Sequence, residues 1–303
     1  MARLFCLDSV MIDVVLRVGE LPARGGDVLA RDQLVTTGGG FNAMSAASRQ
    51  GMTTVYAGRL GVGPFSDLAR SSLDFERIAA PVEPDHEHDL GTCVVLLEPD
   101  GERTFVTSQG AEATLRPRHL DTLGIRDGDV LLVSGYNVMY PELAEIVLGW
   151  ISTLDGVVVA FDPATRMVDI PAPNLAAMLS RADWLLCNRR EATQLTGTSS
   201  SVEAAAKLSD QFGHGVVVRQ GGEGCVVASS SNPPVHVAHF LTQVVDLNGA
   251  GDVHNGVLLA ELDRGSDLLR AAQRANAAAA MAVATLGPAS GPTREELDNW
   301  LAR

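Results

Sequence analysis

The sequence predicts an α/β protein built on a mainly parallel sheet with helices on both faces. From Val130 onward, short apolar runs alternate with helical segments, as in chains that return to a parallel sheet through helices. The apolar runs are continuous, which indicates strands buried on both faces. With 303 residues, 46% of them hydrophobic, the chain can form one large core. We therefore expect residues 1–303 to form a single domain.

Before residue 130, apolar runs predict strands at residues 4–7, 12–18, 28–35 and 55–60, and helices over 43–50 and from Pro64. Residues 92–97 and 103–107 flank the turn Glu98-Pro-Asp-Gly-Glu102, which is typical of a β-hairpin. Asp13 stands among apolar neighbours, where a charge costs free energy unless it is paired or lies in a site. We expect the hairpin to help form a small separate sheet, over about residues 13–36 and 91–108.

After residue 130, the predicted strands are 130–134, 157–161, 184–187 and 216–219, and the predicted helices are 141–154, 174–179, 191–195 and 201–212. A hairpin over 226–228 and 235–240 and helices over 267–286 and 293–302 follow. Polar residues come directly after several strands, at the edge of an open α/β sheet where ligands bind. They are Asp162, Asn188, Gln220 and Asp246.

The stretch from Val244 to Leu262 is the strongest candidate for chemistry. A β-type run at 243–246 leads to Gly249-Ala-Gly-Asp252, after which an apolar helical pattern begins. The first turn of a helix offers unpaired N–H groups and a positive dipole end, so the turn can hold an anion. A carboxylate at Asp252 repels phosphate, but it can take the proton of an attacking hydroxyl. The other interpretation is a glycine turn capped by Asp.

A second glycine cluster, Thr37-Gly-Gly-Gly-Phe-Asn42, precedes the 43–50 helix. Its glycines allow a ligand to approach the backbone closely, and Asn42 offers both a donor and an acceptor. Neither a P-loop nor the dinucleotide motif G-x-G-x-x-G is present, which argues against a nicotinamide-dependent dehydrogenase.

The composition excludes several partners. A net charge of −14 argues against nucleic acid and against an anionic membrane surface. The four cysteines are scattered without a C-x-x-C pair, which suggests reduced thiols and a cytoplasmic location. We find no signal peptide and no apolar stretch long enough to span a membrane. His86 and His88 stand among acids, and a solvated loop explains them better than a metal site.

Two motifs resemble signatures of the ribokinase-like (PfkB) carbohydrate kinases: Asp246-Leu-Asn-Gly-Ala-Gly-Asp252 and the glycine cluster ending at Asn42. Further segments resemble the family's N-x-x-E motif, nucleotide loop, D-x-N-x-R segment and adenine-side helix: 188–197, 219–224, 162–166 (with Ala164 in place of Asn) and 275–280. The runs 98–105 and 292–297 resemble the YegV-type sugar kinases. The resemblance therefore covers nearly the whole chain.

The resemblance implies phosphorylation of a sugar hydroxyl by ATP and Mg²⁺, under a lid formed by the small sheet. It makes Asp252 the base, with Gly249, Ala250 and Gly251 supplying N–H groups. Such an Asp, near a helix N-terminus, should hold its proton weakly. Sugar contacts fall to Asp13, Gly38, Gly39, Asn42 and Arg166, nucleotide contacts to Asn188, Arg219, Gly221, Glu223, Gly224 and Asn276, and Mg²⁺ to Glu191 and Asn188, largely through water. The family often dimerises through its lid, so a homodimer is expected.

Positions at which the sequence departs from the family narrow the range of expected substrates. Met11, Gly39 and the pair Met139-Tyr140 stand where ribokinases carry polar groups, which argues against ribose. Leu247 replaces the usual Thr, while Asp246 and Asn248 can still offer carbonyls to a monovalent cation, so activation by K⁺ stays open.

Two alternatives remain. One is a nucleoside kinase of the same fold, for which Phe41 and Met139 would supply an apolar surface for the base. The other is a catalytically inactive sugar-binding regulator, although no essential group is missing.

Overall fold

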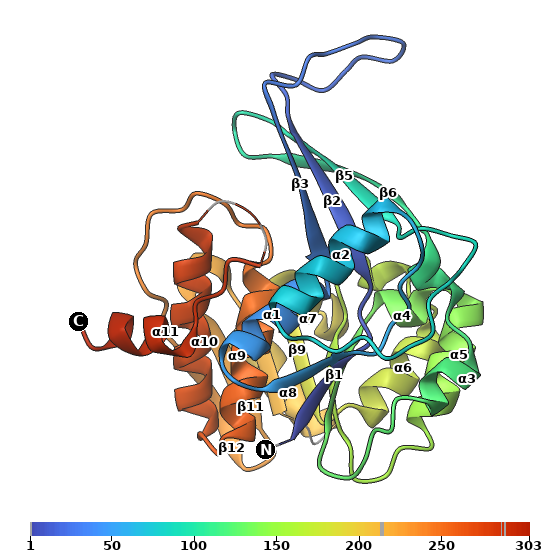
Figure 1. Cartoon of the computed structure of the whole chain (residues 1–303). Coiled ribbons are helices and arrows are strands. Elements are labelled where there is room, and N and C mark those ends of the chain that lie inside the picture. Colours follow the sequence, from blue (N-terminus) through green and yellow to red (C-terminus); the bar gives the residue numbers. More distant parts are fainter. Residues whose placement is uncertain (1, 213–214, 286, 288) are drawn as a thin grey trace.

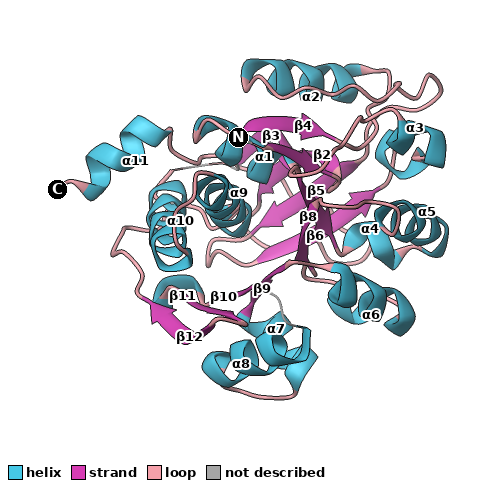
Figure 2. Ribbon diagram, turned by 90° about the horizontal axis from the view of Figure 1, so that it is seen from below, coloured by secondary structure: helices cyan, strands magenta, loops and turns pink. Residues whose placement is uncertain are grey.

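The computed structural model describes residues 2–212, 215–285, 287 and 289–303. Within these residues the main sheet has eight strands in the order β12-β11-β10-β9-β8-β7-β1-β4. The strands from β10 to β4 run parallel, and β11 and β12 pair antiparallel at one edge. Helices lie on both faces of the sheet (Figure 2), which confirms the predicted fold class.

The bounds of the main-sheet strands are β1 Arg3–Cys6, β4 Thr53–Tyr56, β7 Val130–Ser134, β8 Val158–Asp162, β9 Trp184–Asn188, β10 Gly215–Arg219, β11 Cys225–Ser229 and β12 Asn232–Val237. The α-helices are α1 Phe41–Arg49, α2 Pro64–Phe75, α3 Pro117–Asp121, α4 Tyr136–Met139, α5 Pro141–Ile151, α6 Ala172–Arg181, α7 Arg189–Thr196, α8 Ser201–Phe212, α9 Ala250–Asp263, α10 Leu268–Val283 and α11 Arg294–Leu301. Among the described helices, none is long and apolar enough to cross a membrane.

The core has two halves because successive strand residues point to opposite faces of the sheet. On β1, Leu4 and Cys6 pack with the helices α1, α2, α9, α10 and α11, whereas Phe5 packs on the other side. The second half is covered by α3 to α8. Leu4, Phe5 and Cys6 are all fully buried. This two-sided burial is what the continuous apolar runs predicted.

A second sheet of four strands stands apart from the main sheet (Figure 1), in the order β3-β2-β5-β6. Its strands are β2 Val10–Arg17, β3 Asp32–Gly39, β5 Thr92–Leu97 and β6 Arg103–Ser108. β3 begins later than the predicted residue 28, because β2 ends at Arg17, the partner of Asp32. Only residues 7–9 separate β1 from β2, and only Gly40 separates β3 from α1.

The predicted strand at residues 243–246 is wrong. The segment forms no strand, and Val244 and Val245 are 57% and 54% exposed. The main-chain N–H groups of Val245 and Asp246 donate to the carbonyl of Val283, at the end of α10, over 2.7 and 3.1 Å. Apolar β-branched residues favour a strand only where a partner strand is in reach. Here the segment crosses a helix end instead.

Candidate active site

The start of α9 is an open helix N-terminus. Gly249 is its N-cap residue, in the left-handed conformation with φ of 73°, and no side chain among the described residues caps the helix. A Cβ on Gly249 would lie 3.2 Å from Nδ2 of Asn42, so a side chain would crowd that amide as well as strain the backbone. The N–H of Ala250 donates to the Leu247 carbonyl over a long 3.4 Å, while the N–H groups of Gly249 and Gly251 have no partner among the described residues and are left to a ligand or to water.

Asp252 lies in the first turn of α9, against Asn42 of α1. Nδ2 of Asn42 donates to Oδ2 of Asp252 over 3.0 Å. Burial, together with the charges of Asp162 and Asp13, raises the pKa of Asp252 to about 6, although the bond from Asn42 and the charge of Arg219 act to lower it. The expected weak hold on the proton is therefore wrong, because loss of solvation outweighs the helix terminus.

Asp13 faces the same region from β2 of the small sheet. It is 9% exposed, and burial raises its pKa to about 6, partly offset by a hydrogen bond from the Asn248 side chain. A Cβ on Gly38 would lie 2.3 Å from Oδ2 of Asp13, and Gly39 has φ of 64° with the Ser9 carbonyl in the place of its Cβ. The glycine cluster is thus required for the two sheets to join around Asp13.

Asp8 was not singled out from the sequence. It follows β1 and is only partly buried. Its Oδ1 accepts the N–H of Ser9 over 2.8 Å, and the carboxyl group also bonds the Ser134 side chain at the end of β7. Burial raises its pKa to about 7, with Asp252 and Asp162 contributing. Its only sequence signal is a polar residue directly after an apolar strand.

Arg219 and Asp162 form a bonded pair at the ends of β10 and β8. Nη2 of Arg219 donates to Oδ2 of Asp162 over 3.0 Å, and Nδ2 of Asn255 donates to the same oxygen over 2.7 Å. Arg219 also donates to Oδ1 of Asn255 and, over 3.4 Å, to the carbonyl of Gly251. The guanidinium therefore ties the sheet edge to the first turns of α9.

Asn188 and Glu191 cap the N-terminus of α7 by hydrogen bonds to each other. Oδ1 of Asn188 accepts the N–H of Glu191 over 2.9 Å, and Oε2 of Glu191 accepts the N–H of Asn188 over 2.8 Å, which is a capping box. Glu191 is 2% exposed, and burial, with the charge of Asp162, raises its pKa to about 7. Among the described residues, no three His, Cys, Asp or Glu side chains gather closely enough to hold a metal ion by themselves.

The candidate nucleotide residues are spread along one side of the site. Gly221 and Gly224 have φ of 58° and 89° in the turn between β10 and β11. Glu223 in the same turn is paired with Arg189 over 2.6 Å. Asn276 is 7% exposed and already bonded: its Nδ2 donates to the carbonyls of residues 237 and 238, and its Oδ1 lies 3.2 Å from His254.

Two further candidate residues, Arg166 and Asp246, carry ion pairs. Arg166 donates from Nε to Oδ2 of Asp169 over 2.8 Å, and its side chain is 58% exposed. Asp246 pairs with Arg103 of β6 and accepts the N–H groups of Asn248 and Gly287 over 2.9 and 3.1 Å.

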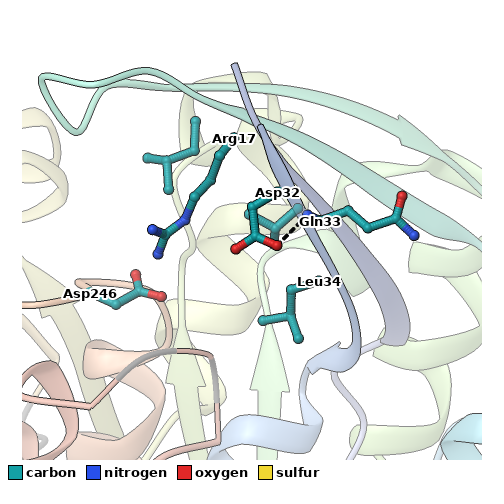
Figure 3. Close-up of a pocket in the computed structure, with 7 residues that line it drawn as sticks. Arg17, Asp32, Gln33, Leu34 and Asp246 are labelled. Carbon is teal, nitrogen blue, oxygen red and sulfur yellow. Dashed lines mark hydrogen bonds between the residues drawn. The ribbon is translucent and has the colours of Figure 1, made fainter. Parts of the chain in front are cut away.

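A small pocket lies between the small sheet and Asp246 (Figure 3). Arg17 of β2 points toward Asp246 in it. Val15 and Arg17, which line the pocket, lie at alternate positions of β2 and therefore on the same face of the strand as Asp13. The lining residues are Val15, Arg17, Asp32, Gln33, Leu34, Leu97 and Asp246.

These features define a ribokinase-like α/β protein with an open helix terminus at the edge of its main sheet. A model of the pfkB family of carbohydrate kinases matches residues 1–295, and the chain belongs to that family. It is 33% identical to the uncharacterized sugar kinase YegV of Escherichia coli K12 over 294 residues, or 95% of this chain and 91% of that protein. The family expected from the sequence is confirmed.

Two further similarities bear on the site. The ATP-dependent ribose-1-phosphate kinase of Halopiger xanaduensis is 29% identical over 306 residues, covering 100% of this chain and 99% of the other. A structure of a putative ribokinase II from E. coli in complex with ATP and Mg²⁺ is similar over the whole of both chains, with a TM-score of 0.86 at 22% identity. Nucleoside kinases share the fold as well.

Proposed function

We propose that the protein transfers the γ-phosphoryl group of ATP to a hydroxyl of a sugar or sugar-like substrate. One observation carries the proposal: a partly buried carboxylate, Asp252, lies in the first turn of a helix whose start is left uncapped. The uncapped turn suits a phosphate, and the carboxylate suits a hydroxyl beside it. Similarity to an ATP-dependent kinase and to an ATP complex supports ATP as the donor.

In this proposal, the γ-phosphate lies against the N–H groups of Gly249, Ala250 and Gly251. The acceptor hydroxyl attacks phosphorus, its proton passes to Asp252, and the bond to the leaving ADP oxygen breaks. With a pKa of about 6, Asp252 is ionised at neutral pH and free to accept that proton. Asn42 holds the carboxylate in place through Oδ2.

Glu191 and Asn188 would hold Mg²⁺ through water, and the ion supplies charge neutralisation to the phosphates. Their oxygens fit this use, since each keeps a lone pair beyond its capping bond and carboxylate and amide oxygens suit Mg²⁺. Arg219, Gly221, Glu223, Gly224 and Asn276 are assigned to the nucleotide side.

On the acceptor side, the proposal assigns Asp13, Gly38, Gly39 and Asn42 to the sugar. Arg166 joins them only if its bond to Asp169 opens. The alternative of a nucleoside kinase needs an apolar surface for the base, which Phe41 and Met139 were expected to supply. These side chains are only 6% and 8% exposed and belong to opposite halves of the core, which argues against such a surface. A catalytically inactive sugar-binding regulator remains the second candidate, since Asn188 and Glu191 complete a structural cap without a metal.

Three further features are proposed with this function. A monovalent cation such as K⁺ would use the main-chain carbonyls of residues 246 and 248, because Arg103 holds the Asp246 carboxylate. The small sheet would serve as a lid over the sugar that keeps water from the phosphate. The four cysteines are free, which fits a cytoplasmic protein.

The lid is also the proposed surface for a homodimer. Its edge strands β3 and β6 expose apolar side chains, with Val35, Phe105 and Val106 39%, 56% and 61% exposed. Exposed strand edges invite pairing with another copy. Sedimentation at micromolar concentration should give a dimer that Val106→Lys weakens, and a monomeric parent protein would remove the proposal.

The test of the function replaces Asp252 by Asn, which keeps the shape and loses the proton acceptor. In a coupled assay over a panel of sugars with ATP and Mg²⁺, we expect kcat to fall by ~10²–10⁴-fold, the usual effect of removing a general base. ATP binding by calorimetry should be kept.

The matched control is Asp267→Asn. Asp267 caps α10 by accepting the N–H of Arg270 over 2.9 Å, and Asn caps about as well as Asp, so kcat should not change. If Asp252→Asn behaves like this control, Asp252 is only a structural residue. Absence of phosphate transfer to any sugar or nucleoside, with ATP bound, would favour the regulator.

A further inference from the structure

The acceptor side of the site is rich in hydrogen-bond acceptors. Asp8, Asp13 and Asp252 surround it, and both Asp8 and Asp13 act electrostatically on Asp252. Asn42 adds a fourth acceptor: it is 3% exposed, its Nδ2 is used by Asp252, and its Oδ1 has no hydrogen-bond partner among the described residues. A buried acceptor without a partner costs free energy until a donor reaches it. The ligand of this region should therefore bring donors.

The arginines near these carboxylates do not balance their charge, because each is bound to another acid. Ionised carboxylates accept hydrogen bonds only and repel other anions at close range. The committed pairs are Arg219 with Asp162, Arg103 with Asp246, and Arg166 with Asp169. A carboxylate or phosphate group beside Asp8, Asp13 and Asp252 would thus meet three acids. Arg17, which is in no ion pair among the described residues, lies four positions along β2 from Asp13 and points toward Asp246 instead.

We propose that Asp8 is a specificity-determining residue that contacts the acceptor and selects a sugar without an anionic group over a sugar acid or sugar phosphate. The inference rests on the proposed kinase function and names its substrate class. Asp8 is held by the N–H of Ser9 and by Ser134, so its carboxyl group is fixed at the end of β1. It would accept a hydrogen bond from a hydroxyl or amino group and repel an acidic substituent.

The selectivity should depend on pH, because burial raises the pKa of Asp8 to about 7. Below this value the group is neutral and its repulsion is lost. The groups that interact with it are Asp252 on α9, Asp162 on β8, Tyr136 on α4, Ser134 on β7, Cys6 on β1 and Tyr56 on β4. Asp252 and Asp13, with pKa values of about 6, also lose charge toward the lower end of this range and repel an anion as Asp8 does. The contribution of Asp8 is therefore the difference between the pH profiles of the kcat/KM ratio in the parent protein and in Asp8→Asn.

The experiment compares matched probes on the full chain: D-glucose, D-glucosamine and D-gluconate, and D-ribose with ribose 1-phosphate. Binding is measured by calorimetry with a non-hydrolysable ATP analogue, and transfer with ATP. We expect neutral or amino sugars to exceed their anionic counterparts by ~100-fold or more, the scale of a like-charge contact. Asp8→Asn should cut this ratio at least tenfold. For D-glucose with D-gluconate, neither of which changes charge in this range, the ratio should fall between pH 8 and pH 6 more steeply in the parent protein than in Asp8→Asn.

The matched control is Asp155→Asn. Asp155 precedes β8 and lies at the opposite edge of the sheet, so losing one negative charge there should leave the ratio unchanged. The proposal is overturned if ribose 1-phosphate or gluconate is the better ligand, or if Asp8→Asn keeps the parent ratio. If Asp8→Asn does not fold, Asp8→Ser takes its place, and a parent-like ratio in that variant overturns the proposal. Selective binding without any transfer would count against the kinase function while leaving the role of Asp8 intact.

Discussion

Two helices, α7 and α9, begin beside the same edge of the main sheet and complete their first turns in opposite ways. At α7, Asn188 and Glu191 exchange hydrogen bonds with each other's main chain, over 2.9 and 2.8 Å. At α9, Gly249 has no side chain to offer, and the acid in the first turn, Asp252, is bonded to Asn42 of another helix. One terminus is closed by its own residues, and the other is left open.

The difference shows which terminus can receive a phosphate. A closed terminus has satisfied its N–H groups within the chain, so a ligand must displace existing bonds. An open terminus gains bonds when the ligand arrives. Substitutions at α9 should therefore change activity, and those at α7 should mainly change stability or metal dependence.

After Asp252→Asn, the largest effect is expected from Gly249→Ala. The new Cβ strains a residue with φ of 73° and crowds Asn42 at 3.2 Å, so the N–H groups move away from the phosphate. Loss of such donors typically lowers kcat by ~10²–10³-fold. The control is Gly197→Ala at the end of α7, where φ is 70° and nothing lies within 4 Å of the added carbon. It should lose similar stability but no activity. Equal kcat in both variants would refute the open-terminus assignment.

Asn42→Ala should have the next largest effect. Its hydrogen bond lowers the pKa of Asp252, so its removal moves that pKa above the present value of about 6. The base must be ionised, so activity is lost as pH falls through its pKa. The acid limb of the kcat/KM profile should thus move to higher pH, with kcat lowered roughly tenfold. Asn174→Ala, which removes a 3.0 Å bond to Val138 on the other face, should leave the profile in place.

Glu191→Gln should have a smaller effect, visible mainly at limiting Mg²⁺. Gln keeps the capping box but not the charge, so turnover in a Mg²⁺ titration should fall severalfold, of the order of tenfold or less. Burial raises the pKa of Glu191 to about 7, so the protonated form is favoured in the folded state. Its contribution to stability is present below the unfolded pKa and is lost as pH rises toward 7. The variant should therefore gain stability relative to the parent between pH 5 and pH 8. An unchanged Mg²⁺ titration would remove Glu191 from the metal site.

The smallest effect on activity is expected from Asn188→Ser, which keeps a capping oxygen without placing a second acid against Oε1 of Glu191, whereas Asn188→Ala removes the cap. The alanine variant should lose about 1 kcal/mol of unfolding free energy, as other lost caps do. Thermal unfolding of the two variants tests this. If Asn188→Ser lost as much stability as Asn188→Ala, the cap would not be the source of the effect.

The sequence predicted the elements whose signal is local. The strand at Val130–Ser134 and the helix at Ser201–Phe212 have the predicted bounds, because continuous apolar runs and helical spacing are set by neighbours in the chain. Residues 243–246 have the same local signal, yet no partner strand lies beside them. Strand formation depends on that partner, which a local pattern does not contain.

Prediction of the site from the sequence was limited in the same way. The glycine turn before Asp252 was visible as a motif, and the structure brings it to Asn42 as a bonded pair. Asp8 belongs to no motif, and only the fold places it near Asp252 and Ser134. The pKa of Asp252 was expected to be low from its helix position, but burial by distant elements raises it to about 6. Charges and solvation are summed over the whole site, so they follow only from the assembled structure.

The short connections between the two sheets have a mechanical consequence. The small sheet joins the main sheet and α1 through residues 7–9 and Gly40, and through longer segments on the β5 and β6 side. Any rotation of the small sheet must be taken up in those short connections, which act as hinges. Asp8 lies within one hinge, and Gly39 and Gly40 form the other beside Asp13 and Asn42. A ligand that binds Asp8 would therefore also restrict the connection at residues 7–9, so that ligand binding and restriction of the small sheet's rotation would occur together.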